Sequence, residues 1–278
     1  MSADPSPEAR AIARLKSQFA ASHVIATLVA NAHQVPVDAV AVFAGLNNDA
    51  RLAMGVRATR QTIPAKGGGL TERVVPLLVT GTNDEERRRD GDIDFGRVML
   101  ELGRLGVGFR DKPPVILAEP EGPHVPCQVW NLLNFLGLLP NGRKPFKYGQ
   151  RDVPALPAFH DPLKGIVTVG LVADAWHMDR VVLTLVRQIL RGVEEGWVDR
   201  QALLLRIVPI ACPCALEGPF GAISTAHLAT GYRNVLEASA SETTRLANYV
   251  DDVGDLDDLL RFLSGNGQYQ PRIVEAVR

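Results

Sequence analysis

Five continuous apolar segments stand out in the hydrophobic pattern of this chain. They cover residues 38–44, 74–80, 114–118, 166–173 and 203–211, and each closes on a glycine, an acidic residue or a cysteine. Apolar side chains that follow one another without alternation are typical of strands covered on both faces. The pattern therefore predicts five buried strands of a parallel sheet.

Segments with helical spacing precede or separate these strands. Residues 7–32 repeat apolar side chains every three to five positions until Pro36, residues 95–105 end near Gly106, and residues 181–190 carry the clearest apolar stripe. Alternating strands and helices predict an α/β protein with a Rossmann-like, doubly wound and mainly parallel sheet. In such sheets ligands bind beyond the carboxyl ends of the strands, so functional residues are expected directly after each apolar segment.

The same pattern predicts how the chain is divided. We expect a Rossmann-like ligand-binding core at residues 36–215 and a small helical subdomain built from residues 1–35 and 216–278. Two connections, at residues 61–73 and 139–164, are longer than a compact sheet needs. They are expected to be long loops, either functional lids or surface insertions.

Composition narrows the class of protein. The chain has 278 residues, of which 46% are hydrophobic and 22% charged, and its formal net charge is −1; this is ordinary for a soluble globular protein. Without a basic excess it is not expected to bind nucleic acid. No apolar run reaches the length of about 18 residues that a membrane span requires. Charged residues near the start do not resemble a secretory signal, and three cysteines suit a reducing compartment. We therefore expect a cytoplasmic protein without a membrane partner, and a homo-oligomer is left open.

Familiar metal-binding and catalytic motifs are missing from the sequence. Cys212 and Cys214 are too close together for a usual zinc knuckle, and the six scattered histidines contain no pair at helical metal-binding spacing. The glycines at 67–69 are not followed by the lysine of a phosphate-binding loop, and no Gly-x-Ser-x-Gly turn of a serine hydrolase occurs. We therefore predict no metal site.

The segment with the most specific chemistry covers residues 170–180. It places His177 and Arg180 at a strand-to-helix turn, where a helix N-terminus offers unpaired backbone N–H groups to a carboxylate or phosphate. Arg180 adds a guanidinium fork suited to the same anion. Residue types alone leave a second interpretation open, in which His177 caps the turn and Arg180 pairs with a nearby carboxylate.

This segment also resembles a known family. It consists of an apolar strand, a small or polar pair, an aromatic residue, His-Met-x-Arg and an apolar helix. This order is similar to the signature of the YdcF/SanA/ElyC family. Other parts follow the family's order: the turn Gly45-Leu-Asn47-Asn48 with Arg51 after the first strand, the strand at 74–80 with its terminal Gly81, and the strand at 115–118 with its terminal Glu119. The resemblance covers residues 38–209, and residues 122–128 depart from the family's Ser-x-Asn-Thr-x-x-Asn phrase.

The resemblance implies a Rossmann-like fold and an S-adenosylmethionine site. Because the chain shows no membrane anchor, it is most similar to the soluble YdcF-like branch. Glu119 would accept hydrogen bonds from the ribose or the amino group, Arg51 or Arg180 would hold the carboxylate, and Trp176 would face the sulfonium or the base. The cofactor-binding residues implied in this way are Gly45, Asn47, Asn48, Arg51, Thr80, Gly81, Glu119, Asp174, Trp176, His177 and Arg180. The catalytic candidates are Glu119 and His177, the latter as a general base where the acceptor must lose a proton.

Three functions are open at this point. The first is a transferase that moves a group from S-adenosylmethionine to a small acceptor held under the connection at 139–164. The second is an enzyme or binding protein for a nucleotide- or phosphate-linked metabolite of the envelope-precursor type. The third is a non-catalytic ligand-binding module whose helical part engages a partner protein.

Overall fold

The helices and strands of this chain form an α/β structure, seen in a computed structural model that describes residues 6–32, 35–44, 48–65, 67–80, 99–100, 103–104, 115–118, 125–148, 151–153, 155–159, 161–163, 165–212, 240, 242, 246 and 252–265. Its strands are β1 (Ala39–Phe43), β2 (Arg60–Pro64), β3 (Leu70–Val74), β4 (Leu77–Thr80), β5 (Val115–Ala118), β6 (Phe146–Tyr148), β7 (Arg151–Val153), β8 (Thr168–Asp174) and β9 (Arg206–Cys212). Its helices are α1 (Pro7–Asn31), α2 (Asn48–Ala58), α5 (Val125–Phe135), α6 (Met178–Glu194) and α9 (Leu256–Gly265), with short 3-10 turns at Ala175–His177 and Arg200–Leu204.

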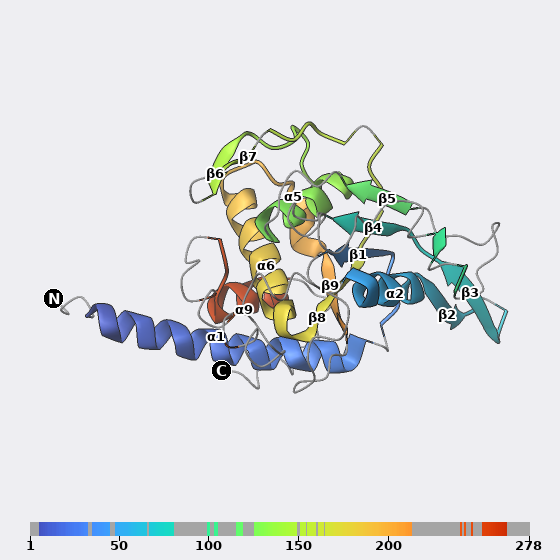
Figure 1. The fold of residues 1–278 in the computed structure, drawn as a ribbon, viewed down its shortest axis with the longest axis horizontal. Helices are drawn as coiled ribbons and strands as arrows, with labels where there is room; N and C mark the ends of the chain where they lie inside the picture. The colour runs from blue at the N-terminus through green and yellow to red at the C-terminus, as the bar shows by residue number, and fades with distance from the viewer. Residues whose placement is uncertain are drawn as a thin grey trace.

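A five-stranded sheet with the order β5-β4-β1-β8-β9 lies at the centre of the molecule (Figure 1). Every neighbouring pair in this sheet is parallel. The chain proceeds from β1 outwards to β4 and β5 on one side, and then crosses to β8 and β9 on the other. This order confirms the predicted Rossmann-like, doubly wound α/β fold.

Both faces of the sheet are covered, as the unbroken apolar segments predict. All five residues of β1 are buried. Ala41 and Phe43 belong to the hydrophobic core that the sheet shares with α5 and α6, whereas Val40 and Val42 belong to the core on the α2 side. Because successive side chains of a strand point to opposite faces, a strand buried on both faces needs an apolar residue at every position.

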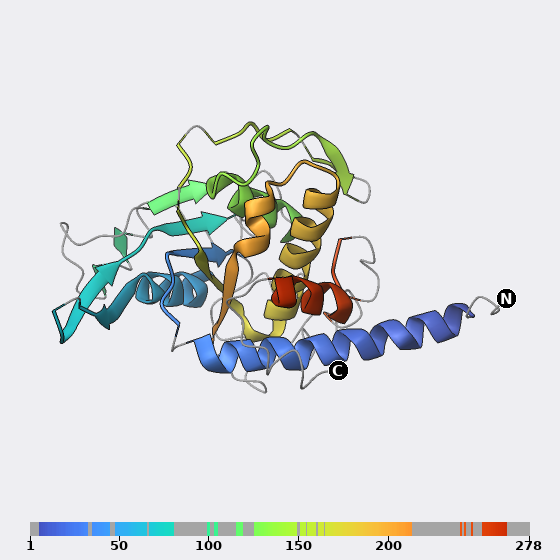
Figure 2. The ribbon, with the colours of Figure 1, turned by 180° about the vertical axis from the view of Figure 1, so that it is seen from behind.

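Two helices far apart in the sequence, α1 and α9, pack against each other and against α6 (Figures 1 and 2). Residues from the second half of α1 and from α9 are buried in the core that also contains α6: Ala21, Val24, Ile25, Leu28, Leu259, Phe262 and Leu263. The first half of α1 projects beyond the rest of the molecule, and its Phe19 is 70% exposed. The division of the chain into a core and a helical subdomain stays a prediction.

The connection at residues 61–73, predicted to be a long loop, is an antiparallel hairpin instead. β2 and β3 pair from Arg60 with Val74 to Pro64 with Leu70. Gly68 and Gly69 form its tip with φ values of +85° and +84°, which glycine adopts without strain. The hairpin side chains are half-buried or exposed, so no apolar alternation marks the two strands in the sequence.

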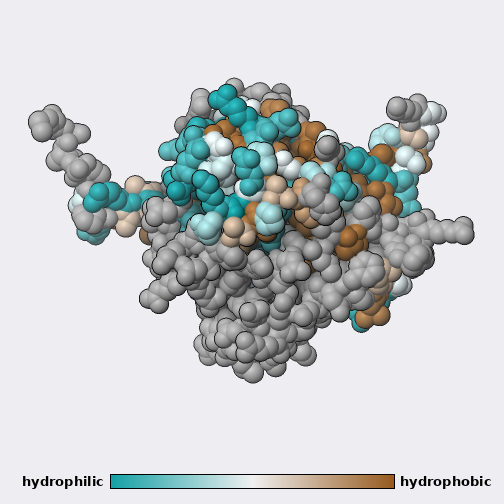
Figure 3. Space-filling view, turned by 90° about the horizontal axis from the view of Figure 1, so that it is seen from above, coloured by the Kyte–Doolittle hydropathy of each residue, from teal (hydrophilic) through white to brown (hydrophobic). Residues whose placement is uncertain are grey.

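The second long connection also contains a paired element, formed by β6 and β7. It lies beside the C-terminal end of α6, and the described surface on this side is mainly hydrophilic with scattered hydrophobic residues (Figures 1 and 3). The backbone N–H of Asp199, just before the turn that leads into β9, donates to the carbonyl of Leu138. The described part of this connection therefore starts near the amino end of β9. The position of an acceptor beneath this connection stays a prediction.

Two smaller differences concern element bounds. Residues 203–211 were expected to form one strand, but Arg200–Leu204 form a 3-10 turn and β9 begins at Arg206. The side chain of Asp199 caps this turn by accepting from the backbone N–H of Gln201 at 2.8 Å. Of the helix expected at 95–105, only residues 99–100 and 103–104 are described, and they are helical.

Candidate functional site

At the carboxyl ends of the five strands, the last residues lie level with one another in two groups. Phe43, Thr80 and Ala118 stand at the same level at the ends of β1, β4 and β5. Asp174 and Cys212 stand at the same level at the ends of β8 and β9. The order of strands changes direction between β1 and β8, which is where ligands bind in sheets of this type. The described carboxyl edge is therefore the candidate site.

Several predicted site residues lie outside the described residues. They are Gly45, Asn47, Gly81 and Glu119, together with the side chain of Asn48. In the sequence, each comes shortly after the end of β1, β4 or β5. Their predicted roles toward a cofactor stay predictions.

A buried ion pair lies at the carboxyl ends of the neighbouring strands β1 and β8. Arg51 of α2 donates from one Nη to Asp174 Oδ2 at 2.7 Å and from the other to the carbonyl oxygen of Phe43 at 2.6 Å. Both side chains of the pair are only 1% exposed. The two predicted ligand-binding residues thus neutralise each other, and they connect α2 with the ends of β1 and β8. A ligand carboxylate at Arg51 would have to compete with Asp174.

Thr80 and Gln128 border the same strand ends from the other side. The Thr80 side chain is completely buried, and its hydroxyl has no hydrogen-bond partner in the described structure. Gln128 of α5 donates from Nε2 to the carbonyl oxygen of Ala44 at 2.8 Å. This bond ties α5 to the backbone directly after β1.

The turn at His177 and Arg180 already holds a carboxylate of the chain itself. Glu242 places Oε2 at 3.1 Å from Arg180 Nε and Oε1 at 3.6 Å from His177 Nδ1. The second interpretation of the sequence is therefore confirmed for Arg180, which pairs with a carboxylate. The His177 side chain makes no capping hydrogen bond. Glu242 occupies the position at which a ligand anion was expected.

His177 is neutral at physiological pH. Burial, together with the positive charge of Arg180, lowers the pKa of its imidazole to about 4. Arg180 Nη2 lies 3.3 Å from Nδ1 of the ring. Nδ1 therefore faces both a donor, the Arg180 guanidinium, and an acceptor, Glu242 Oε1 at 3.6 Å. Because the lowered pKa makes the imidazole a weak base, the general-base role of His177 stays a prediction.

A pocket of about 390 Å³ opens between α1 and the start of α6. Trp176, Asp179 and Arg180 line it from the turn, and Gln18 lines it from α1. The hydroxyl of Ser22 donates to Asp179 Oδ2 at 2.5 Å, and burial raises the pKa of that carboxyl. Gln18 is 4% exposed, and neither end of its amide has a hydrogen-bond partner in the described structure. Trp176 and Arg180 are thus predicted site residues that border an open space.

Sequence analysis missed Gln18 and Glu242. Gln18 continues the buried stripe of Ala21, Ile25 and Leu28 toward the start of α1. A polar residue at a position where the helical period predicts an apolar one was the signal that could have identified it. Nothing in the sequence relates Glu242 to a turn more than sixty positions earlier. Its partners became visible only in the folded chain.

Neither the described residues nor comparisons with known proteins assign this site to a known class. Within the described part of the chain, no group of three or more His, Cys, Asp or Glu side chains is arranged to hold a metal ion. None of the described helices is both long enough and apolar enough to cross a membrane. No protein-family model, curated protein or solved structure matches this chain. The resemblance to the YdcF/SanA/ElyC family therefore stays a prediction.

Proposed function

We propose that this chain is a transferase that binds S-adenosylmethionine at the carboxyl edge of β1, β4 and β5 and moves a group from its sulfonium to a small acceptor. The Rossmann-like strand order supports this location, because the strand order reverses beside β1. Two glycines and a glutamate follow these three strands in the sequence. Glycine allows a close approach of the backbone to a ligand.

The charge balance of this edge carries the proposal. Two arginines at this edge are paired with carboxylates, Arg51 with Asp174 and Arg180 with Glu242. Lys16 and Asp179 also line the pocket beside α1, and they contribute one positive and one negative charge. The described groups therefore offer no excess of positive charge to a polyphosphate. A ligand with a sulfonium, an ammonium and one carboxylate fits this balance better.

The chain's own contribution is positioning. When bound, S-adenosylmethionine supplies an electrophilic carbon next to a positively charged sulfur. Glu119 is assigned to the ribose or amino group, and the face of Trp176, which borders the open pocket, is assigned to the cation. Because the pKa of His177 is about 4, its ring is a weak base, and an acceptor that loses a proton would release it to solvent. Holding acceptor and carbon in line is sufficient for this class of transfer.

Calorimetric titration tests the proposal. We expect S-adenosylmethionine to bind with micromolar affinity and ATP to bind at least about tenfold more weakly, because the described charges at this edge are balanced and leave no excess for the ATP phosphates. S-adenosylhomocysteine, which lacks the sulfonium charge, should also bind more weakly.

Two carboxylate variants locate the site. Glu119→Ala should weaken binding of S-adenosylmethionine about tenfold, which corresponds to about 1.4 kcal/mol. Glu195→Ala, at the far end of α6, is the matched control and should leave it unchanged. Tighter binding of ATP than of S-adenosylmethionine would reject the proposal, and so would the absence of saturation by either ligand.

A further inference from the structure

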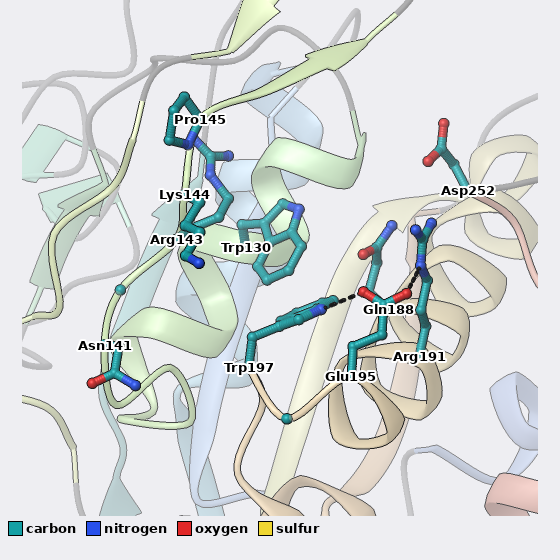
Figure 4. Close-up of a pocket in the computed structure, with 12 residues that line it drawn as sticks. Trp130, Asn141, Arg143, Lys144, Pro145, Gln188, Arg191, Glu195, Trp197 and Asp252 are labelled. Carbon is teal, nitrogen blue, oxygen red and sulfur yellow. Dashed lines mark hydrogen bonds and ion pairs between the residues drawn. The ribbon is translucent and has the colours of Figure 1, made fainter.

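A second pocket lies at the other end of α6, away from the carboxyl edge (Figure 4). Its volume is about 440 Å³, within the range of small-molecule sites. Its walls come from α5, from the C-terminal end of α6 and the turn after it, from residues 141–145 and from Asp252. These segments are distant in the sequence, so the pocket exists only in the folded chain.

Two tryptophans form one wall of this pocket. The rings of Trp130 and Trp197 have centroids 3.9 Å apart at an interplanar angle of 41°. Trp197 reaches this place because α6 ends in a Schellman motif. In it, the N–H of Trp197 donates to Gly192 and the N–H of Gly196 donates to Val193. A Cβ at Gly192 would lie 2.6 Å from the Trp197 ring, so only glycine lets the indole lie this close to the helix.

A buried amide faces the space between this wall and Arg191. Gln188 of α6 is only 5% exposed, and its side-chain amide makes no hydrogen bond in the described structure. Figure 4 shows the two tryptophans in the middle of the pocket residues, with Lys144 on one side of them and Gln188 and Arg191 on the other. Because this amide has no partner within the described protein and faces the pocket, it can both donate to and accept from a ligand there.

The charged residues of this pocket have an excess of one positive charge. Glu195 accepts from Arg191 Nε at 2.7 Å and from Trp197 Nε1 at 2.9 Å. These hydrogen bonds hold the pKa of the Glu195 carboxyl below its usual value, so it stays ionised. Asp252 is the second carboxylate, and the three cations are Arg143, Lys144 and Arg191.

We propose that this pocket binds a sugar of monosaccharide size that carries one acidic group. The C–H face of a sugar ring can pack on the indole wall. Its hydroxyls can donate to Glu195 and Asp252 and pair with the Gln188 amide. A phosphate or carboxylate on the ring would meet Arg143 and Lys144. A purely aromatic anion fits less well, because it has no donors for the two carboxylates. This site is independent of the proposed transferase function.

Titration with sugars tests this site. Tryptophan fluorescence and calorimetry would be recorded with glucose 6-phosphate, glucuronate, glucose and inorganic phosphate. The fluorescence signal would be read in a Trp176→Phe background, where Trp130 and Trp197 are the tryptophans that report. We expect saturable binding of at least one acidic sugar and about tenfold weaker binding of glucose and of phosphate alone. The tighter of the two acidic sugars identifies the acidic group.

Three variants test whether the acidic sugar binds in this pocket. Lys144→Ala changes an exposed side chain, so it should fold normally and weaken the acidic sugar about fivefold without affecting glucose. Gln188→Leu should weaken glucose and the acidic sugar alike. Lys16→Ala, on α1, is the matched control and should change neither.

Several results would overturn the proposal. They are no saturation with any sugar, equal affinities for glucose and the acidic sugars, inorganic phosphate binding as tightly as glucose 6-phosphate, and equal effects of Lys144→Ala and Lys16→Ala. Failure of S-adenosylmethionine to bind would leave this inference untouched, because the two titrations report on opposite ends of α6.

Discussion

The two ends of α6 use the same residue types in different ways. At its start, Arg180 pairs with Glu242, whose side chain is 4% exposed, and both lie beside the buried ring of His177. At its end, Arg191 pairs with Glu195, and these side chains are 45% and 47% exposed. Charges at the start are therefore largely shielded from water, whereas charges at the end interact in water. The first pair supports the fold, and the second remains accessible to a ligand.

The buried glutamines differ in a similar way. Gln18 and Gln188 are both nine-tenths buried or more, and neither amide has a hydrogen-bond partner in the described structure. Both ends of the Gln18 amide are enclosed by the protein. The amide of Gln188 is not enclosed in this way, and it faces the open pocket (Figure 4). The two buried amides therefore differ in whether a ligand can reach them.

Breaking a dry ion pair should have the largest effect on stability. We expect Asp174→Ala to lower the free energy of unfolding by about 3–5 kcal/mol, because the buried guanidinium of Arg51 loses the carboxylate that balances its charge. Urea denaturation at neutral pH measures this loss. Glu195→Ala removes the carboxylate of the exposed pair at the end of α6 and should cost only a few tenths of a kcal/mol. Similar losses in the two variants would contradict the comparison.

Acid should act on the start of α6 through His177. Its pKa is about 4 in the folded protein and 6.5 in the unfolded chain, so the unfolded state binds more protons between these values. Stability is therefore expected to fall as the pH falls through this range, by on the order of 3 kcal/mol from this group. Burial raises the pKa of Asp179 and Asp258, and these groups act in the opposite direction at the lower end of the range.

Replacing the histidine isolates this contribution. His177→Gln should flatten the dependence of the unfolding free energy on pH between about 4 and 6.5. His23→Gln changes an exposed histidine on α1 and serves as the control, with the wild-type slope expected. A slope that persists in His177→Gln would show that other groups cause it.

The smallest effect is expected from the two glutamines. Gln18→Leu should raise the free energy of unfolding by about 1 kcal/mol, because leucine replaces an enclosed amide that has no partner. Gln188→Leu should change stability less, since water reaches that amide through the pocket. Thermal denaturation of the two variants measures the difference. If Gln18→Leu were less stable than the wild type, the amide of Gln18 would have to form a stabilising hydrogen bond, and the prediction would be wrong.

Local patterns in the sequence predicted most of the described core. β1 and β8 were expected at 38–44 and 166–173 and lie at Ala39–Phe43 and Thr168–Asp174. The hairpin of β2 and β3 was missed, because exposed polar strands have no apolar period. Arg51 and Asp174 were selected as ligand-binding residues, but their pairing with each other was not foreseen. Gln188 and the two tryptophans of the second pocket were not selected at all.

The sequence by itself determined the five strands of the central sheet, the apolar helix that follows β8 and the class of fold, because the periods of buried side chains are local and each element must bury its own apolar residues. The tertiary structure alone decided which charges meet. Arg51 reaches Asp174, Glu242 reaches Arg180, and Trp197 lies against Trp130, each across a separation that no short pattern encodes. Such contacts depend on how the layers pack, and packing decides whether a charge is enclosed or left open to a ligand.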